Sequence, residues 1–202
     1  SFGNLEASPP VTVDGVEYPF GRIYYGEGIK QGQVDFMEAQ EVQEPFVLDT
    51  SWLCVGHVDE FSTFVPDPSS DKGFKLVVAD TKLGLELLDS VDPGLSLPRY
   101  QFDHGFATAG EMQSDGPLRA YNEDLQDDHL EPIIEAFKQN LGLEDSDILR
   151  LPSIFEIAPF QGCSQAQLAL SLVPGMVNLI VDNDADGNTT LYVPDPFFRA
   201  NI

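Results

Sequence analysis

The chain has 202 residues and a mass of 22.2 kDa, and its 34 acidic residues against 10 Lys and Arg give a formal net charge of −24. This length fits one domain or two small ones, and a hydrophobic content of 42% is that of a folded globule rather than a disordered chain. A field this negative repels phosphate backbones and anionic lipid, which argues against nucleic-acid and membrane partners and favours cationic ligands such as metal ions or guanidinium groups.

The first part of the chain predicts short strands around one helix. Residues 11–28 predict a hairpin with Asp14-Gly15 as a type I′ turn, followed by an extended stretch that ends the segment. We expect a short acidic helix at 34–43, a strand at 45–48 and a loop at 51–60. Two further strands are expected on either side of a Pro- and Ser-rich loop, at 61–65 and 74–79.

The second part of the chain predicts helices and then strands. Asp80 is placed to cap a helix that runs to about residue 90, with Leu83, Leu87 and Leu88 facing inward. Residues 92–115 are rich in Gly and Pro and receive no assignment. Extended structure is expected at 148–157, a buried strand at 176–181 and its hairpin partner at 189–193.

One apolar stripe is clear enough to define a helix by itself. It ends at Gly142, and Pro132 lies in its first turn or at a kink. The stripe has helical spacing and consists of Leu130, Ile133, Ile134, Phe137 and Leu141. Because hairpins alternate with helices along the chain, we predict an α/β fold built from repeated ββαβ-like units.

The densest group of reactive residues lies at 51–60, which holds the only Trp, one of the three His and one of the two Cys. If this segment is extended, His57 and Asp59 lie on one face. A His beside a carboxylate is suited to acid–base chemistry because the carboxylate stabilises its charged form. The spacing alone does not separate this reading from a loop His in a solvated acidic turn.

Six motifs follow in order over nearly the whole chain: SFGNLE at 1–6, SPPVTV at 8–13, EYPFGRI at 17–23, GHVDEF at 56–61, GLEDSDI at 142–148 and PGMVN at 174–178. In these motifs the sequence resembles the catalytic domain of protein-arginine deiminases. The resemblance implies the five-bladed αβ-propeller, or pentein, fold. We expect residues 1–202 to be a single partial catalytic domain, the central ββαβ blades of an incomplete propeller, with the outer blades missing from this chain.

The resemblance also implies an activity, the calcium-dependent hydrolysis of peptidyl-arginine in proteins or peptides to peptidyl-citrulline and ammonia. This reaction needs two carboxylates that clamp the guanidinium, a thiolate that attacks its carbon and a His that protonates the departing ammonia. By residue-to-residue match, His57 is the acid–base residue and Asp59 one clamping carboxylate. Asp59 and Trp52 are predicted to contact the substrate.

The remaining catalytic residues have no match here, since the second Asp would precede Ser1 and no His-Cys-Gly-Thr-type motif follows residue 196. We therefore expect a longer or nicked protein whose companion fragments supply both. The alternative is a non-catalytic deiminase-like protein that binds calcium or a guanidinium ligand; a different pentein enzyme is a weaker third reading. Vertebrate members of the resembled family are intracellular, whereas the acidity, the low Lys content and the sequon at Asn188 slightly favour secretion.

Two segments are candidates for binding Ca²⁺. By resemblance, Phe2 and Leu5 supply backbone carbonyls and Glu6 a carboxylate, which suits an ion that takes roughly six to eight oxygen ligands. Independently, the DNDADG segment fits the first half of an EF-hand loop. Its acids are Asp182, Asp184 and Asp186. Because the twelfth position is Val rather than Glu, an exposed acidic hairpin turn is the favoured alternative.

The two Cys residues and the two remaining His residues have simpler interpretations. Cys54 and Cys163 are too few for a disulfide framework, although they could pair once. We expect Cys54 to be a packed, inert thiol and Cys163 a loop thiol. His104 and His129 have no partner at metal-ligand spacing and are expected to be surface or satisfied loop residues.

Overall fold

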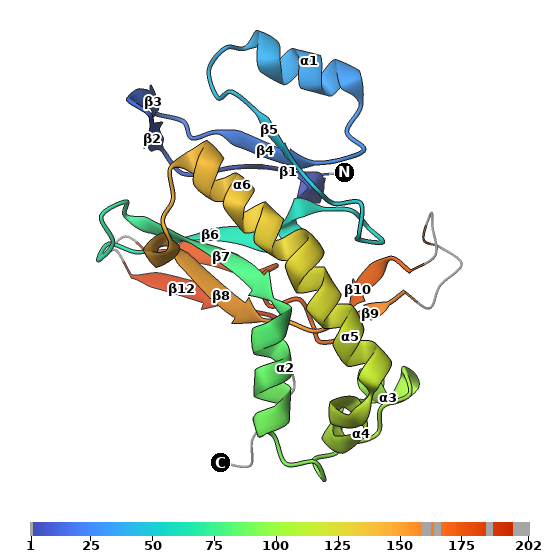
Figure 1. Ribbon diagram of the computed structural model, residues 1–202. Helices are drawn as coiled ribbons and strands as arrows, with labels where there is room; N and C mark the ends of the chain where they lie inside the picture. The colour runs from blue at the N-terminus through green and yellow to red at the C-terminus, as the bar shows by residue number, and fades with distance from the viewer. Residues whose placement is uncertain (1, 159–162, 164–166, 185–187, 196–202) are drawn as a thin grey trace.

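Two ββαβ units with the same topology organise the molecule, as seen in the computed structural model of the chain (Figure 1). In each unit the first two strands are antiparallel, and the third, reached through helical structure, is parallel to the second. The first unit consists of β1 (Leu5–Ala7), β4 (Ile23–Gly26), α1 (Gln31–Ala39) and β5 (Phe46–Leu48). The second has β6 (Ser62–Pro66), β7 (Phe74–Asp80), several helices and β8 (Ile148–Pro152). The predicted α/β class and ββαβ repetition are thereby confirmed.

The structure describes residues 2–158, 163, 167–184 and 188–195. In the first unit, the predicted hairpin is present as β2 (Val11–Val13) and β3 (Val16–Tyr18), inserted between β1 and β4. Its turn residues Asp14 and Gly15 have φ values of 50° and 82°, which a type I′ turn requires. The predicted helix at 34–43 is shifted, because α1 starts at Gln31 and the positive φ of Glu41 ends helical structure.

Helix α2 (Thr81–Ser90) begins where Asp80 was expected to cap it, since the Asp80 carboxylate accepts a hydrogen bond from the Leu83 N–H at 2.7 Å. Leu88 is buried as predicted, but Leu87 is 47% exposed and Leu85 takes the inward position instead. The unassigned stretch contains two short helices, α3 (Arg99–Asp103) and α4 (Ala109–Ser114).

The predicted Leu130–Leu141 helix is the last part of a longer helical run. That run consists of α5 (Gly116–Leu125), the π-helical turn η3 (Gln126–Leu130) and α6 (Glu131–Leu141). Pro132 has no N–H and its ring crowds the carbonyl four residues back, and the π-helical turn before it lets the chain stay helical. Neither this run nor another helix in the described ranges has the length and apolar character needed to cross a membrane.

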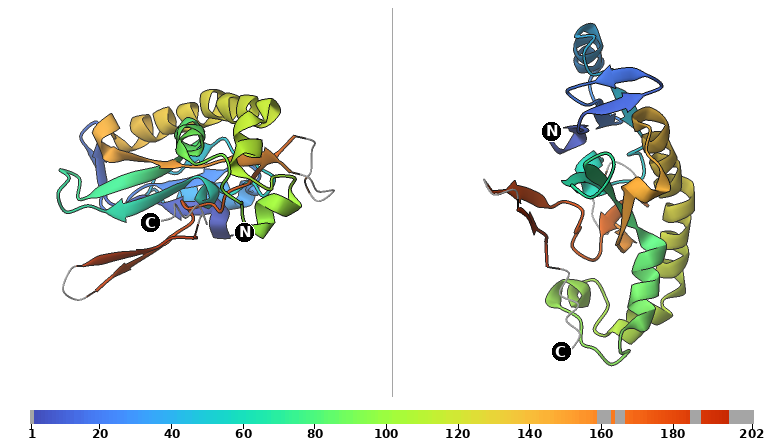
Figure 2. Two further views of the ribbon diagram at one scale, coloured as in Figure 1. Left: turned by 90° about the horizontal axis from the view of Figure 1, so that it is seen from below. Right: turned by 90° about the vertical axis from the view of Figure 1, so that its left-hand side faces the viewer.

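Helix α6 provides the core that the two units share. Its predicted stripe is buried throughout, and Gly142 ends it with a φ of 63°. The ring of Phe137 lies 5.1 Å from that of Tyr24 and 6.0 Å from that of Phe46 in the first unit, and 6.2 Å from that of Phe64 in the second. Figure 2 shows α5 and α6 as one layer over the sheets. One aromatic side chain therefore connects both sheets.

The last described segments form two hairpins. Strand β9 (Phe155–Ile157) pairs with β10 (Ala169–Ser171), and β11 (Ile180–Asn183) with β12 (Thr189–Tyr192). The second pairing confirms the predicted partner at 189–193, but the predicted buried strand at 176–181 is wrong. Residues 176–178 form a turn that buries Val177, while Ile180 starts the strand 69% exposed. Figure 2 shows this hairpin extending away from the sheets.

Candidate active site

The candidate site lies between the two units, where the chain passes from β5 to β6. His57 precedes the 3₁₀-helix η2 (Val58–Glu60), so the expectation of an extended segment is corrected for these residues. The preceding loop is held to the start of β10 by backbone hydrogen bonds. The Cys54 N–H donates to the Ala169 carbonyl at 3.0 Å, and the Ala169 N–H donates to the Trp52 carbonyl at 2.8 Å.

His57 and Asp59 come together although their backbone is not extended. Nδ1 of His57 lies 3.8 Å from Oδ1 of Asp59, and the two side chains are 20% and 30% exposed. Burial raises the pKa of the Asp59 carboxyl above its ordinary value, and a charged His57 opposes that rise. The pair combines an imidazole ring with a half-buried carboxylate that lacks full hydration. Such a carboxylate is suited to a cationic ligand.

Glu60 holds the backbone of His57 in place, a role that the sequence did not indicate. Its carboxylate accepts a hydrogen bond from the His57 backbone N–H at 2.9 Å. Burial, which outweighs the hydrogen bond from His57, raises the pKa of Glu60 to about 7, and the negative charge of Asp59 adds to the rise. The only signal in the sequence is that Asp59 and Glu60 are adjacent. Adjacency does not indicate which of the two carboxylates binds the backbone N–H of His57.

The amino-terminal segment packs directly against η2. This segment comprises the 3₁₀-helix η1 (Phe2–Asn4) and β1, and η2 contacts both. Gly3 lies so close to Asp59 that a Cβ atom on Gly3 would collide with the carboxylate. Burial raises the pKa of Glu6, and the charge of Asp59 raises it further. The segment therefore brings a second half-buried carboxylate to the site.

The predicted calcium ligands at the amino-terminal end agree with Ca²⁺ in chemical type, since Phe2 and Leu5 offer carbonyl oxygens and Glu6 a carboxylate. Within the described ranges, no group of three or more His, Cys, Asp or Glu side chains is arranged to hold a metal ion. Calcium binding by Phe2, Leu5 and Glu6 therefore stays a prediction.

The second calcium candidate lies at the end of the β11–β12 hairpin. Asp182 belongs to β11 and is exposed. The Asp184 carboxylate accepts hydrogen bonds from the backbone and side-chain N–H groups of Asn188, both at 2.8 Å. Asp186 lies outside the described residues. The described part of the segment is a hydrogen-bonded hairpin end.

A cavity of 740 Å³ opens beside His57. His57 lines this cavity, whereas Asp59 is not among the described lining residues. The loop contributes Thr50, Ser51, Leu53, Cys54, Val55, Gly56 and His57 to the lining, and the first unit contributes Glu27, Lys30 and Gln33 among others. A ligand in this cavity would meet the first unit and the loop that leads from it to η2.

Trp52 belongs to the core in this structure, with 4% of its surface exposed. Its indole N–H donates to the Asp49 carbonyl at 3.2 Å. Its ring stacks on His129 at 5.7 Å and meets Phe155 edge-on at 5.2 Å. These contacts fix the start of the site loop, whereas the predicted contact of Trp52 with substrate stays a prediction.

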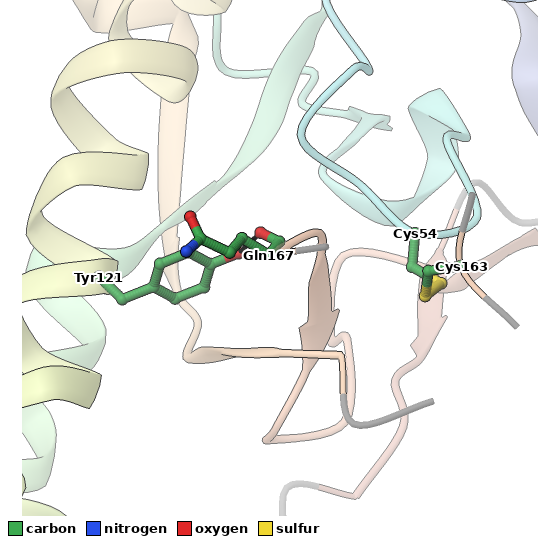
Figure 3. The surroundings of a disulfide bond; sticks show 4 residues. All are labelled: Cys54, Tyr121, Cys163 and Gln167. Atoms are coloured by element: carbon green, nitrogen blue, oxygen red, sulfur yellow. Dashed lines mark hydrogen bonds between the residues drawn. A yellow bond between two sulfur atoms is a disulfide. The ribbon is translucent and has the colours of Figure 1, made fainter. Parts of the chain in front are cut away.

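Cys54 and Cys163 form a disulfide with a Cα–Cα distance of 5.1 Å (Figure 3). The expectation of two unpaired thiols is wrong, and the possibility of a single pair is confirmed. The residues are 109 positions apart, so no local pattern could indicate the pairing. Neither Cys is a free nucleophile while the bond is intact.

The other two His residues have carboxylate partners, in agreement with their predicted satisfied character. Nδ1 of His129 lies 2.7 Å from the carboxylate of Asp49, and Nδ1 of His104 lies 2.5 Å from that of Glu156. Both pairs connect segments more than 50 residues apart. They tie the fold together at positions separate from His57.

Comparisons with known proteins agree with the motifs at the site. A family model described as protein-arginine deiminase (PAD) matches residues 1–198. The chain is 36% identical over 218 residues to protein-arginine deiminase type-4 of Homo sapiens, covering 98% of this chain and 30% of that protein. It is 37% identical over 200 residues to the human type-1 protein, covering 90% of this chain and 28% of that protein. The chain thus spans less than a third of the length of these curated relatives.

Proposed function

The chain belongs to the protein-arginine deiminase family, and on that premise we propose that its full-length protein hydrolyses arginine side chains of proteins or peptides to citrulline and ammonia. The observation that carries the proposal is the approach of His57 to Asp59, at 3.8 Å, beside a cavity of 740 Å³. These are the two residues that the family resemblance assigns to acid–base chemistry and guanidinium binding.

Asp59 is proposed to clamp the guanidinium of the substrate. A carboxylate can accept two parallel N–H donors from a guanidinium, and the interaction is stronger where water is partly excluded. Burial disfavours the charged form of Asp59 in the free site, and a bound guanidinium supplies the missing positive charge. Substrate binding would therefore lower the pKa of Asp59.

His57 is proposed to carry the proton that leaves with ammonia and then to activate the hydrolytic water. Its position is fixed at the backbone by Glu60 and at the side chain by its approach to Asp59. Because Cys54 and Cys163 are paired, we propose that the attacking thiolate and the second clamping carboxylate come from other segments of the full-length protein. The two ββαβ units would then be central blades of a pentein propeller.

Calcium is proposed to bind through the Phe2 and Leu5 carbonyls and the Glu6 carboxylate, together with ligands from outside this segment. A bound Ca²⁺ would neutralise negative charge beside Asp59. The raised pKa of Glu6, caused by burial and by the charge of Asp59, supports a cation at this position. The carboxylate of Glu6 itself would stay deprotonated as a ligand and hold the amino-terminal segment against η2.

The experiment measures citrulline formation from an arginine-containing peptide by the full-length protein, with Ca²⁺ and with a calcium chelator. We expect turnover only with Ca²⁺, and a loss of at least about 10²-fold in His57→Ala and Asp59→Asn. Asp71→Asn, in an exposed loop, is the matched control and should retain the wild-type rate. Undiminished turnover in His57→Ala would overturn the role of this residue.

A second outcome would support the alternative of a non-catalytic, deiminase-like binding protein. In that case the wild-type protein would bind an arginine peptide without producing citrulline, and Asp59→Asn would weaken the binding. Binding is measured by calorimetry with the same variants, so that loss of the clamp and loss of turnover are separated.

A further inference from the structure

The loop that carries His57 is packed in the core at Trp52 and Leu53 and has fewer attachments between Cys54 and Gly56. Between β5 and η2 it contains no strand, and its backbone is tied to β10 through the Ala169 hydrogen bonds. The covalent attachment is the Cys54–Cys163 disulfide, three residues before His57. The position of His57 relative to Asp59 therefore depends on what holds Cys54 as well as on the Glu60 hydrogen bond.

The chain beyond Cys163 is attached to the long helical run at Gln167. Beyond Cys163, the backbone carbonyl of Gln167 accepts a hydrogen bond from the Tyr121 hydroxyl of α5 at 2.9 Å (Figure 3). Leu168 and Ala169 follow and are buried. The disulfide thus connects the His57 loop to Cys163, four positions before a residue that is hydrogen-bonded to α5.

We infer that the Cys54–Cys163 disulfide is a redox-sensitive positioning bond, which holds the His57 loop in the geometry that brings the His57 ring to Asp59. Breaking the bond leaves the loop with the buried Trp52 and Leu53, the two Ala169 hydrogen bonds and the Glu60 hydrogen bond to His57, and the stretch between Cys54 and His57 then opens more often. The effect of reducing the disulfide on turnover rests on the proposed function, whereas the effect of reduction on loop opening does not.

The bond is within reach of a small reductant. Cys54 lines the 740 Å³ cavity, and both Cys residues are only partly buried. A thiolate of a dithiol reductant attacks one sulfur and forms a mixed disulfide, and the second thiol of the reductant resolves it. Two electrons and two protons pass to the protein, which gains two thiols, while the dithiol becomes a cyclic disulfide.

The first test counts thiols in the denatured, unreduced chain. We expect none, and two reactive thiols would overturn the inference. The second test follows amide hydrogen exchange in the native chain before and after treatment with dithiothreitol. The Cys54 and Ala169 amides, which form the backbone ties, should exchange at least about tenfold faster after reduction.

Two variants separate the disulfide from the neighbouring hydrogen bond. Cys54→Ser/Cys163→Ser should show the fast exchange without reductant and no further response to it. Tyr121→Phe removes the hydrogen bond to Gln167 and keeps the disulfide, so it should remain sensitive to the reductant. Because the reduced wild-type chain gives the same comparison without a substitution, a double variant that fails to fold does not end the test.

The third measurement reports on His57 itself. The imidazole proton resonances of the chain, assigned with His57→Gln, should shift for His57 on reduction and stay in place for His104. Complete reduction, verified by mass, with unchanged exchange and unchanged His57 resonances would overturn the inference. None of these three measurements requires turnover, so they test the inference even if the proposed deiminase activity is absent.

Discussion

The two ββαβ units share a topology and differ in how they are buried. In the second unit, β7 is buried along almost its whole length, and the helical run covers its sheet. In the first unit, α1 buries Met37 alone, and Phe36 on the same helix is 66% exposed. The first unit completes its core with Phe137 from α6, a helix of the second unit. Two units with the same topology therefore need not each have an independent hydrophobic core.

This difference explains where the candidate site lies. η2 contacts β1 and β4 of the first unit as well as β6 of the second. Asp59 packs against Gly3, and the backbone of His57 is held by Glu60 at the end of η2. The candidate site forms at the junction, the place where the two units meet at η2. Changes that weaken the contact between the units should therefore alter the site.

The largest expected effect comes from the residue that joins the two units. Phe137→Ala removes a fully buried ring from both sheets and should lower the free energy of unfolding by about 3–5 kcal/mol, measured by urea denaturation. Phe36→Ala is the matched control and should change it by less than about 0.5 kcal/mol, because the Phe36 ring is exposed. Equal losses in the two variants would show that the first unit is stabilised by α1 after all.

A substitution at the junction should affect the site with less effect on the core. Gly3→Ala places a methyl group against the Asp59 carboxylate and displaces it. On the proposed function, kcat/KM of the full-length protein for an arginine peptide should fall about 10²-fold, because such a shift misplaces the guanidinium. Gly32→Ala in α1 meets no atom and should leave kcat/KM unchanged. A Gly3→Ala protein with normal kcat/KM would place the guanidinium clamp elsewhere.

The local elements of this fold could be predicted from the sequence because their causes are local. The α6 stripe, the Asp80 cap and the Asp14-Gly15 turn each lie within a few residues of the structure they determine. The short helices α3 and α4 could not, because they depend on caps and packing in a stretch rich in Gly and Pro. The apolar run at 176–181 predicted a buried strand wrongly, because its first residues form a buried turn and its last residues belong to an exposed strand.

The site shows the same limit. His57 and Asp59 could be named because two positions in one motif carry both residues. The disulfide connects positions 109 residues apart, and the collision between Gly3 and Asp59 depends on two segments that meet only in the folded chain. Glu60 stands beside Asp59 in the sequence, but its role follows from the turn of η2. What was missed depends on contacts that only the folded chain makes.

The smallest of these effects is a dependence of stability on pH that arises at the junction. Burial raises the pKa of Glu60 from an ordinary 4.5 to about 7 in the folded chain, so the folded state binds a proton more tightly than the unfolded state. The stability that this proton contributes is complete below pH 4.5 and is lost as pH rises through 7. The raised pKa values of Asp59 and Glu6 act in the same direction.

The free energy of unfolding should therefore fall between pH 5 and pH 8, with about 1–2 kcal/mol of the fall due to Glu60. Glu60→Gln, which keeps an oxygen acceptor for the His57 N–H, should flatten the profile by that amount in urea denaturation at several pH values. Glu86→Gln, exposed on α2, should keep the wild-type slope. If Glu60→Gln keeps that slope as well, the pH dependence arises outside the junction. A flattened profile would assign the pH dependence of stability to the buried carboxyl of Glu60.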